Sequence, residues 1–314
     1  MPLHSSPLLD MTFQVAGIGE VLWDLLPGGR QLGGAPANFA YHAGALGAKA
    51  WVVSRVGDDT AGRDLIARLG SLGLATDAVE VDPVAPTGTV TVEVDGGGQP
   101  RFTIHESVAW DALAAGPSGL RAVASADAVC FGTLAQRSLP ARDALRSLLR
   151  AAKPDALRVF DVNLRQHFYS ATMIEESLAF ADVLKVNDSE LPRLAGMFRL
   201  AGDERARIAG LAARHRLRAV ACTRGGSGSL LWADGRWSEH PGVPTQVADT
   251  VGAGDSFTAA MTLGLLAGWD LDVINARANA VASHVASCSG ATPELPPGLR
   301  APFLAIRSRP RQER

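Results

Sequence analysis

Two aspartates, three small residues and an apolar run lie close together in the segment DTVGAGDSF at residues 249–257. The apolar spacing that follows predicts a helix that begins within this segment. Because the first N–H groups of a helix lack intrahelical partners, a turn of small residues there can hold an anion. A carboxylate at Asp255 would repel that anion, unless it takes the proton of an attacking hydroxyl. The segment therefore fits phosphoryl transfer to an alcohol, although Asp255 could also be a plain helix cap.

Other motifs for nucleotide or nucleophile chemistry are absent. GIGEVL at 17–22 lacks the third glycine of the dinucleotide fingerprint, and no Walker-type phosphate loop occurs. GGSGS at 225–229 is not a nucleophile elbow, because Ser229 stands where a glycine is required. No H-E-x-x-H motif or Cys/His cluster predicts zinc. A phosphate-handling enzyme would depend on the 249–257 turn, whose helix start should keep Asp255 ionised and hence a weak base.

The composition describes a globular chain that acts on small molecules. Among its 314 residues 47% are hydrophobic, and the formal net charge of −2 argues against a nucleic-acid partner. No apolar run is long enough to span a membrane, and no signal peptide is recognised. Cys130, Cys222 and Cys288 lie in apolar surroundings, as reduced thiols of a cytoplasmic protein do. Met1 and Met11 are both candidate start residues.

Short strand-like runs alternate with runs of helical length along most of the chain. This alternation predicts one α/β domain over residues 13–310, in which helices cover both faces of a mainly parallel sheet. Residues 1–12 and 308–314 are expected to be flexible ends. The predicted strands are 13–19, 51–57, 128–133, 158–163, 183–187, 219–223 and 229–232, and the predicted helices are 36–47, 60–72, 139–151, 203–215, 255–267 and 272–287.

A hairpin interrupts this alternation. TVTVEV at 89–94 and PRFTIHE at 100–106 alternate apolar and polar residues around a glycine-rich loop at 95–99. Together with the run at 21–26, they predict a small β appendage within residues 20–32 and 86–110. This appendage could be a lid over a pocket or an edge hairpin with no role.

Two long motifs resemble the signatures of the ribokinase-like (PfkB) carbohydrate kinases. DTVGAGDSFTAA is similar to their C-terminal signature and LGGAPANFAYHAGALGA at 32–48 to their N-terminal one, within a similarity that spans residues 13–298. The resemblance implies a three-layer α/β sandwich with a mainly parallel central sheet and a β lid. It also implies ATP-dependent phosphorylation of a sugar hydroxyl, with ATP and Mg²⁺ as cofactors and K⁺ as a further candidate.

The resemblance assigns the chemistry to the C-terminal motif. Asp255 becomes the catalytic base, and the backbone of Gly252, Ala253 and Gly254 becomes the anion hole. Asp249 lies where the family often binds a monovalent cation, although it could equally brace the turn. The carbonyl ligands would come from positions near Val251, Val285, Cys288 and Gly290.

Residues near the N-terminus resemble the sugar-binding positions of the family. A carboxylate can accept hydrogen bonds from two vicinal hydroxyls, and an amide both donates and accepts. Local sequence alone would make Asp24 a turn residue and Asn38 a polar residue at a helix start. Gln136 and Arg137 follow a strand end and could line the sugar side. The sugar-binding positions implied by the resemblance are Asp24, Gly33, Gly34 and Asn38.

Three stretches resemble the nucleotide side of the family site. VNDSE at 186–190 matches an N-x-x-E element, in which Asn187 and Glu190 would lie near the phosphates and Glu190 would hold Mg²⁺ through water. A helix cap is the alternative for this element. Asn279 falls near the adenine region, although it could simply lie on a helix surface. TRGGSGS at 223–229 would bring Thr223, Gly225 and Gly228 to ATP.

The acceptor sugar is predicted from smaller motifs. GEVLWD at 19–24, GGAPANFAYH and DVNLR at 161–165 look most like bacterial fructokinases. Ala35 and Pro36 stand where ribokinases more often carry Gly-Lys-Gly after the glycine pair. Arg165 could reach a phosphate or form a surface salt bridge. A 2-keto-3-deoxygluconate kinase could use Arg101, Arg137 or Arg165 for the carboxylate, and a nucleoside kinase could stack a base on Trp23, Phe102 or Trp110.

A second class of function stays open, namely a sugar or nucleotide binder on the same fold that has lost turnover. Asp255 beside an intact Gly-Ala-Gly favours an active kinase, because a decayed kinase is expected to lose its base first. The alternating strands of the hairpin also permit, without requiring, a homodimer through the lid. Trp110 could be a lid-proximal aromatic or a core residue, and His42, His105 and His167 receive no role.

Overall fold

The structure is a computed structural model and describes residues 12–94 and 100–308 of the chain. The expected hairpin loop at 95–99 and most of the expected flexible ends lie outside the described residues. The main sheet contains β1 (Gln14–Ile18), β4 (Lys49–Gly57), β5 (Val79–Asp82), β8 (Ala128–Phe131), β9 (Leu157–Asp161), β10 (Val183–Asn187), β11 (Ala219–Thr223), β12 (Ser229–Ala233) and β13 (Arg236–His240). Their order is β13-β12-β11-β10-β9-β8-β1-β4-β5, and neighbours are parallel except at the β11-β12-β13 edge.

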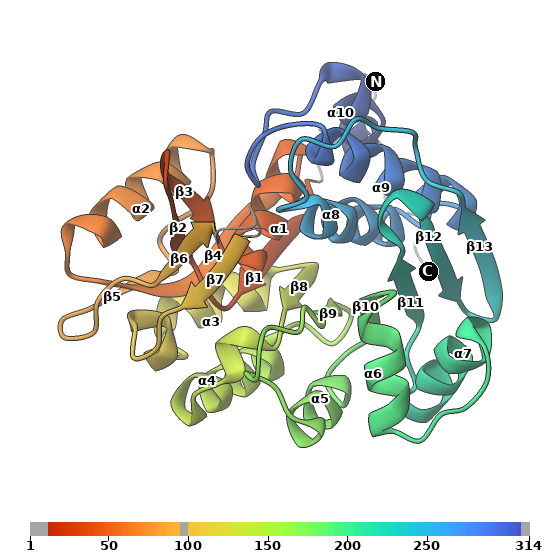
Figure 1. Cartoon of the computed structure of the whole chain (residues 1–314), viewed down its shortest axis with the longest axis horizontal. Helices are drawn as coiled ribbons and strands as arrows, with labels where there is room; N and C mark the ends of the chain where they lie inside the picture. The colour runs from red at the N-terminus through yellow and green to blue at the C-terminus, as the bar shows by residue number, and fades with distance from the viewer. Residues whose placement is uncertain (1–11, 95–99, 309–314) are drawn as a thin grey trace, which may run out of the picture.

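Helices cover both faces of this sheet and make a three-layer sandwich (Figure 1). Successive residues of a strand point into opposite layers, so that Val15 packs on one side and Ala16 on the other. The expected fold class is confirmed. One face packs against α1 (Ala35–Ala45), α2 (Thr60–Ser71), α8 (Ala253–Leu266), α9 (Leu271–Ala286) and α10 (Pro297–Leu304). The other packs against α3 (Pro117–Ser125), α4 (Leu139–Ala151), α5 (Ala171–Leu178), α6 (Glu190–Met197) and α7 (Glu204–His215).

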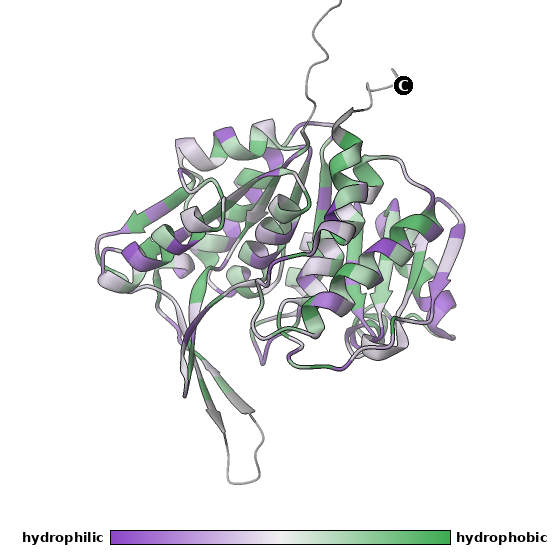
Figure 2. Cartoon of the chain, turned by 90° about the horizontal axis from the view of Figure 1, so that it is seen from above, coloured by the Kyte–Doolittle hydropathy of each residue, from purple (hydrophilic) through white to green (hydrophobic). Residues whose placement is uncertain are grey.

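A second sheet of four strands stands apart from the sandwich. It contains β2 (Leu22–Leu26), β3 (Gly29–Gly33), β6 (Thr89–Val94) and β7 (Pro100–Ile104) in the order β3-β2-β6-β7. Figure 2 shows the β6–β7 hairpin extending away from the body. One face of this sheet is apolar, because Leu22, Val90, Val92 and Ile104 pack with Trp110 and its neighbours at the base of the hairpin. Phe102 lies opposite Val92 in the register but is 48% exposed.

The central strands are apolar because both of their faces are covered. All four residues of β8 are buried, and so are the first four residues of β10 and of β11. Two buried positions in the central strands are charged: Asp161 ends β9 and Lys185 lies within β10. A charge inside such a strand needs a partner, and the partner of each is the other.

Candidate active site

The two signature segments meet at the start of two packed helices. Helix α1 begins after Gly34 and helix α8 after Gly252. Asn38, in the first turn of α1, donates from Nδ2 to Oδ2 of Asp255, in the first turn of α8, at 2.9 Å. The two residues are 217 positions apart in the chain. Asn38, expected at the sugar, thus also orients the expected base.

Glycines open the turn ahead of α8. Gly252 has a φ of 78°, and a Cβ there would lie 2.5 Å from the carbonyl oxygen of Ala291. A Cβ on Gly254 would lie 3.0 Å from Nζ of Lys185. The N–H of Ser256 donates to the Gly252 carbonyl at 2.9 Å, so the helical ladder starts there. The N–H of Ala253 makes a long hydrogen bond of 3.3 Å to the Thr250 carbonyl, and those of Gly252 and Gly254 can face an anion.

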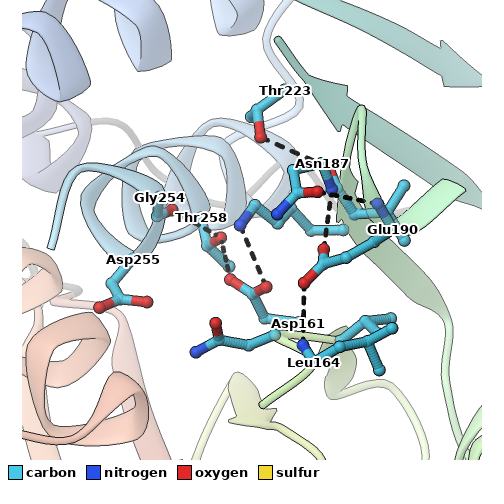
Figure 3. A network of polar contacts seen from close by, with 12 residues as sticks. Asp161, Leu164, Asn187, Glu190, Thr223, Gly254, Asp255 and Thr258 are labelled. Carbon is cyan, nitrogen blue, oxygen red and sulfur yellow. Dashed lines mark hydrogen bonds and ion pairs between the residues drawn. The ribbon is translucent and has the colours of Figure 1, made fainter. Parts of the chain in front are cut away.

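A buried polar network lies directly behind this turn (Figure 3). Nζ of Lys185 is 3.1 Å from Oδ1 of Asp161, and the two side chains are 7% and 6% exposed. The hydroxyl of Thr258, one turn along α8, donates to Oδ2 of Asp161 at 2.7 Å. None of these three residues was predicted to belong to the site. A lysine inside the apolar strand VLKVN was the sequence signal that could have indicated a buried partner.

The protonation of Asp255 differs from the expectation. Burial raises its pKa to about 6, and the nearby charge of Asp161 acts in the same direction. The hydrogen bond from Asn38 and the charges of Lys185 and Arg165 oppose this rise. The prediction of a weak base at a helix start was therefore wrong, because the loss of water outweighs the helix dipole. At neutral pH the carboxylate is still mostly ionised and is a stronger base than an ordinary aspartate.

Two further carboxyls with raised pKa values lie on the sugar side. A Cβ on Gly33 would lie 2.3 Å from Oδ2 of Asp24, so only glycine leaves room for that carboxylate. Burial raises the pKa of Asp24 to about 6. Burial also raises the pKa of Glu20 to about 7, and the negative charge of Asp255 adds to this rise. Glu20 is 3% exposed and was not predicted as a site residue. The charge of Arg165 lowers the pKa of all three carboxyls, which places its guanidinium within electrostatic reach of the pocket.

The N-x-x-E element connects two strand ends. Glu190 is buried and accepts hydrogen bonds from the N–H of Asn187 at 2.9 Å and from that of Leu164 at 2.8 Å (Figure 3). Oδ1 of Asn187 accepts from the N–H of Glu190 at 2.9 Å. The helix cap considered above is therefore present at the start of α6, where Asn187 supplies the acceptor. The carboxylate of Glu190 also ties the loop after β9 to β10, next to the Lys185 network.

The nucleotide-side loop after β11 is built by glycine. The 3₁₀ turn Gly225–Ser227 follows Thr223, whose hydroxyl donates to the Val186 carbonyl at 3.4 Å. A Cβ on Gly228 would lie 2.0 Å from the carbonyl oxygen of His240, so this loop lies directly against the segment after β13. Asn279 is only 7% exposed and donates to Ser229 at 2.7 Å, so it is not the helix-surface residue considered above.

Three other residues are engaged inside the protein. Gln136 is 2% exposed, and its amide donates to the Gly132 carbonyl and the Ser177 hydroxyl, so it is engaged within the protein. Trp110 is a core residue at 1% exposure. Arg137 stacks 3.9 Å from the ring of Trp110 and makes an ion pair with Asp111 at 2.7 Å. The charge of Arg137 is thus already neutralised within the chain.

Asp249 braces the turn ahead of α8 through two backbone N–H groups. Its Oδ1 accepts from the N–H of Val251 at 3.0 Å and its Oδ2 from that of Gly290 at 3.1 Å. Within residues 12–94 and 100–308, no group of three His, Cys, Asp or Glu side chains could hold a metal ion. A cation near Asp249 would therefore depend on backbone carbonyls. In the same ranges, no helix combines the length and the apolar character that a membrane crossing requires.

The fold, the glycine turn and the carboxylate of Asp255 fit a carbohydrate kinase, and the chain belongs to the pfkB family of carbohydrate kinases, whose model matches residues 28–297. The expected family and enzyme class are confirmed. A fructokinase of Klebsiella pneumoniae is 31% identical over 261 residues, which are 80% of this chain and 83% of that protein. PH1459, an uncharacterized sugar kinase of Pyrococcus horikoshii, is 29% identical over 288 residues, or 86% of this chain and 88% of its own.

Solved structures agree with this assignment. The crystal structure of PH1459 in complex with ATP has a TM-score of 0.75 at 28% identity, and covers 88% of this chain and 94% of its own. A fructokinase of Vibrio cholerae, solved with fructose, ADP and a calcium ion, has a TM-score of 0.76 at 24% identity over 94% of this chain and 99% of its own. A double mutant of that fructokinase was solved with fructose, ADP and a potassium ion. The chain is therefore a sugar kinase with the ribokinase-like fold.

Proposed function

We propose that this sugar kinase transfers the γ-phosphoryl group of ATP to D-fructose and forms fructose 6-phosphate. The observation that carries the proposal is the hydrogen bond from Asn38 to Asp255. It joins the segment that resembles a sugar-binding signature to the turn that fits a phosphate. A sugar hydroxyl bound at Asn38 would therefore lie beside a base and in front of the anion-binding N–H groups.

Asp255 is the proposed base and the backbone of Gly252, Ala253 and Gly254 the proposed anion hole. The sugar oxygen attacks the γ-phosphorus, its proton passes to Asp255, and the bond to the leaving ADP oxygen breaks. A pKa of about 6 suits this task, since the carboxylate is ionised at neutral pH and still accepts a proton late in the transfer. The helix-start N–H groups would stabilise charge on the transferring phosphoryl oxygens.

Asp24, Gly33 and Gly34 are the proposed sugar contacts besides Asn38. The carboxylate of Asp24 can accept from two vicinal hydroxyls, and Gly33 leaves it the space to turn toward the pocket. Gln136 is left out of this proposal because its amide is engaged with Gly132 and Ser177. A neutral polyhydroxylated sugar fits a pocket in which carboxyls with raised pKa values outnumber cations.

Thr223, Gly225, Gly228 and Asn279 are the proposed nucleotide contacts. Asn279 would contribute its Oδ1, because its Nδ2 donates to Ser229 and Asn275. Mg²⁺ usually keeps several waters and binds phosphates directly, which fits a site where Asn187 and Glu190 already spend part of their acceptor capacity on backbone N–H groups. Bound there through water, Mg²⁺ would supply positive charge to the phosphates. Arg165, within electrostatic reach of Asp255, would supply more from the other side.

A monovalent cation, with K⁺ as the first candidate, is proposed at the brace formed by Asp249. Carbonyls near Val251, Val285, Cys288 and Gly290 would complete its ligands. The support is the link from Asp249 to Gly290, which brings both loops to one carboxylate. A cytoplasmic location is proposed from the three free cysteines, and a homodimer through the lid remains a proposal as well.

A 2-keto-3-deoxygluconate kinase is the second candidate, and it rests on Arg165. This guanidinium acts on the carboxyls of the pocket, so it could also meet the carboxylate of an acidic sugar. Arg137 is less suited to that task because Asp111 already neutralises it. Fructose is favoured because a fructokinase of Klebsiella pneumoniae is 31% identical to this chain.

The test is an ATP-consumption assay on purified protein over fructose, ribose, 2-keto-3-deoxygluconate, tagatose and adenosine, with and without K⁺. We expect the highest kcat/KM on fructose, with fructose 6-phosphate identified by phosphorus NMR. An Asp255→Asn variant serves as the control for contaminating kinases. Turnover on 2-keto-3-deoxygluconate without turnover on fructose would replace the first candidate with the second.

A further inference from the structure

A buried ion pair behind the anion-binding turn has no part in the function proposed so far. Lys185 and Asp161 lie directly opposite each other in the register of β10 and β9. Their charged atoms are 3.1 Å apart and nearly inaccessible to water. Replacing a buried ion pair by apolar residues is often neutral or stabilising, so fold stability alone is a weak reason for this pair.

The pair touches the first turn of α8 at two points. The hydroxyl of Thr258 lies 2.7 Å from Oδ2 of Asp161 and 3.0 Å from the Gly254 carbonyl, and the shorter contact is to the carboxylate. Nζ of Lys185 lies 3.0 Å from the position that a Cβ of Gly254 would occupy. The proposed anion hole and the proposed base therefore rest on a charged support rather than on an apolar one.

The charges of the pair act on Asp255 in opposite directions. Asp161 raises the pKa of Asp255 and Lys185 lowers it. Other groups also face this carboxyl: Asn38 from α1, Arg165 from the loop after β9, Glu20 from the segment after β1, and the thiol of Cys130 from β8. Among them only Lys185 is a buried cation. Without it, no buried cation would offset the negative charge of Asp161, which acts on Asp255.

We propose that Lys185 is a positioning residue for phosphoryl transfer, which pairs with Asp161 to hold the first turn of α8 and to keep Asp255 in its proton-accepting form. The positive charge beneath Gly254 also favours the phosphoryl group in the anion hole. This inference rests on the proposed role of Asp255. It adds to that role a residue that touches neither sugar nor nucleotide.

The test is the pH dependence of kcat/KM in two single variants and their double variant. Lys185→Met removes the cation, and we expect the acid limb of the profile to move up by about one pH unit, the size of a single nearby charge effect. Asp161→Asn removes the anion, and the limb should move down. The double variant leaves no unpaired buried charge, so it should fold and place its limb between those of the single variants. A limb that stays at its wild-type position in either single variant overturns the proposal.

Matched controls separate this effect from a loss of fold. Lys153→Met breaks a lysine–aspartate pair at Asp127, near the opposite ends of the strands, and should leave the acid limb in place. Thr258→Val removes the hydroxyl bonded to Asp161 and should lower kcat, while Thr258→Ser should restore it; equal kcat in the two variants contradicts the support of α8. If Asp255→Asn retains turnover, the proposed base fails. If Asp255→Asn is inactive but the acid limbs of the Lys185 and Asp161 variants do not move, the positioning role of Lys185 fails while the proposed base stands.

Discussion

Helices α7 and α8 start in different ways: a side chain caps the start of α7, whereas the start of α8 has no side-chain cap and forms part of the proposed site. Helix α7 begins after Asp203, whose carboxylate accepts a hydrogen bond from the N–H of Ala206 at 2.8 Å. Helix α8 begins at Gly252, which has no side chain to offer its first N–H groups. In one helix the chain satisfies its own donors. In the other, apart from the N–H of Ala253, which donates to the Thr250 carbonyl at 3.3 Å, the chain leaves these donors for a ligand. The carboxyl of Asp255, whose pKa is raised, lies beside them.

The largest effect in this comparison should come from the carboxyl itself. We expect Asp255→Asn to lower kcat by ~10²–10⁴ because the variant cannot accept the proton of the sugar hydroxyl. Binding of nucleotide and sugar, followed by calorimetry, should persist. Asp203→Asn, which keeps a capping side chain on α7, is the control and should turn over normally. Undiminished turnover in Asp255→Asn would remove its assigned role.

A smaller loss is expected when the open helix start is filled. Gly252→Ala should lower kcat by ~10²-fold, since the added Cβ strains a positive φ and meets the Ala291 carbonyl, which displaces donors of the anion hole. Gly70→Ala in α2 is the control, because a Cβ there meets nothing within 4 Å. That control should keep full activity. Single-turnover kinetics on both variants would detect the difference, and equal rates would refute the anion hole.

The proposed function should also cost stability at the start of α8. The pKa of Asp255 is raised from an ordinary 3.8 to about 6 in the folded protein. Between pH 3.8 and pH 6 this carboxyl is therefore more often protonated in the folded state than in the unfolded state. Its contribution to stability is therefore greatest at low pH and is lost as pH rises through about 6. Asp255→Asn should stabilise the protein by about 1–2 kcal/mol at pH 8 and by little at pH 4. Urea unfolding at both pH values measures this, and a variant that is less stable at pH 8 contradicts it.

The smallest effect should come from the capped helix. Asp203→Ala removes the cap of α7 and should destabilise the protein by about 1 kcal/mol. Turnover should not change, because α7 lies on the face of the sheet opposite α8. Thermal unfolding and kcat, measured on the same preparation, separate the two. A loss of turnover that exceeds the loss of folded protein would show that this helix start also serves the site.

The parts of the fold that the sequence predicted are those with a strong local pattern. Strands β1, β8, β10 and β11 are apolar runs, as expected of strands covered on both faces. The edge strands β5 (VEVD) and β13 (RWSEH) were missed because they are short and half polar. Helices α5 and α6 were also missed, because each contains only eight residues, which is too short for a clear helical period.

The candidate site divides in the same way. Asp255 and the glycine turn were predicted because they are consecutive in the chain. Lys185 and Asp161 are 24 residues apart and meet only through the register of two neighbouring strands, which no local pattern specifies. The raised pKa of Asp255 likewise depends on water excluded by α1, β9 and β10 together, and the helix-start argument could not include that.

The hydrogen bond between Asn38 and Asp255 has a consequence for how the protein matures. It closes a loop of 217 residues. Asn38 in the N-terminal signature therefore has no hydrogen-bond partner at Asp255 until most of the chain has been synthesised. During synthesis, β1, β4 and α1 can pack against one another before Asp255, the proposed base, has been translated. Contacts between such distant residues form late and slowly. Recovery of turnover after dilution from denaturant would thus report the final docking of the C-terminal helices, and no shorter fragment from the N-terminus could show it.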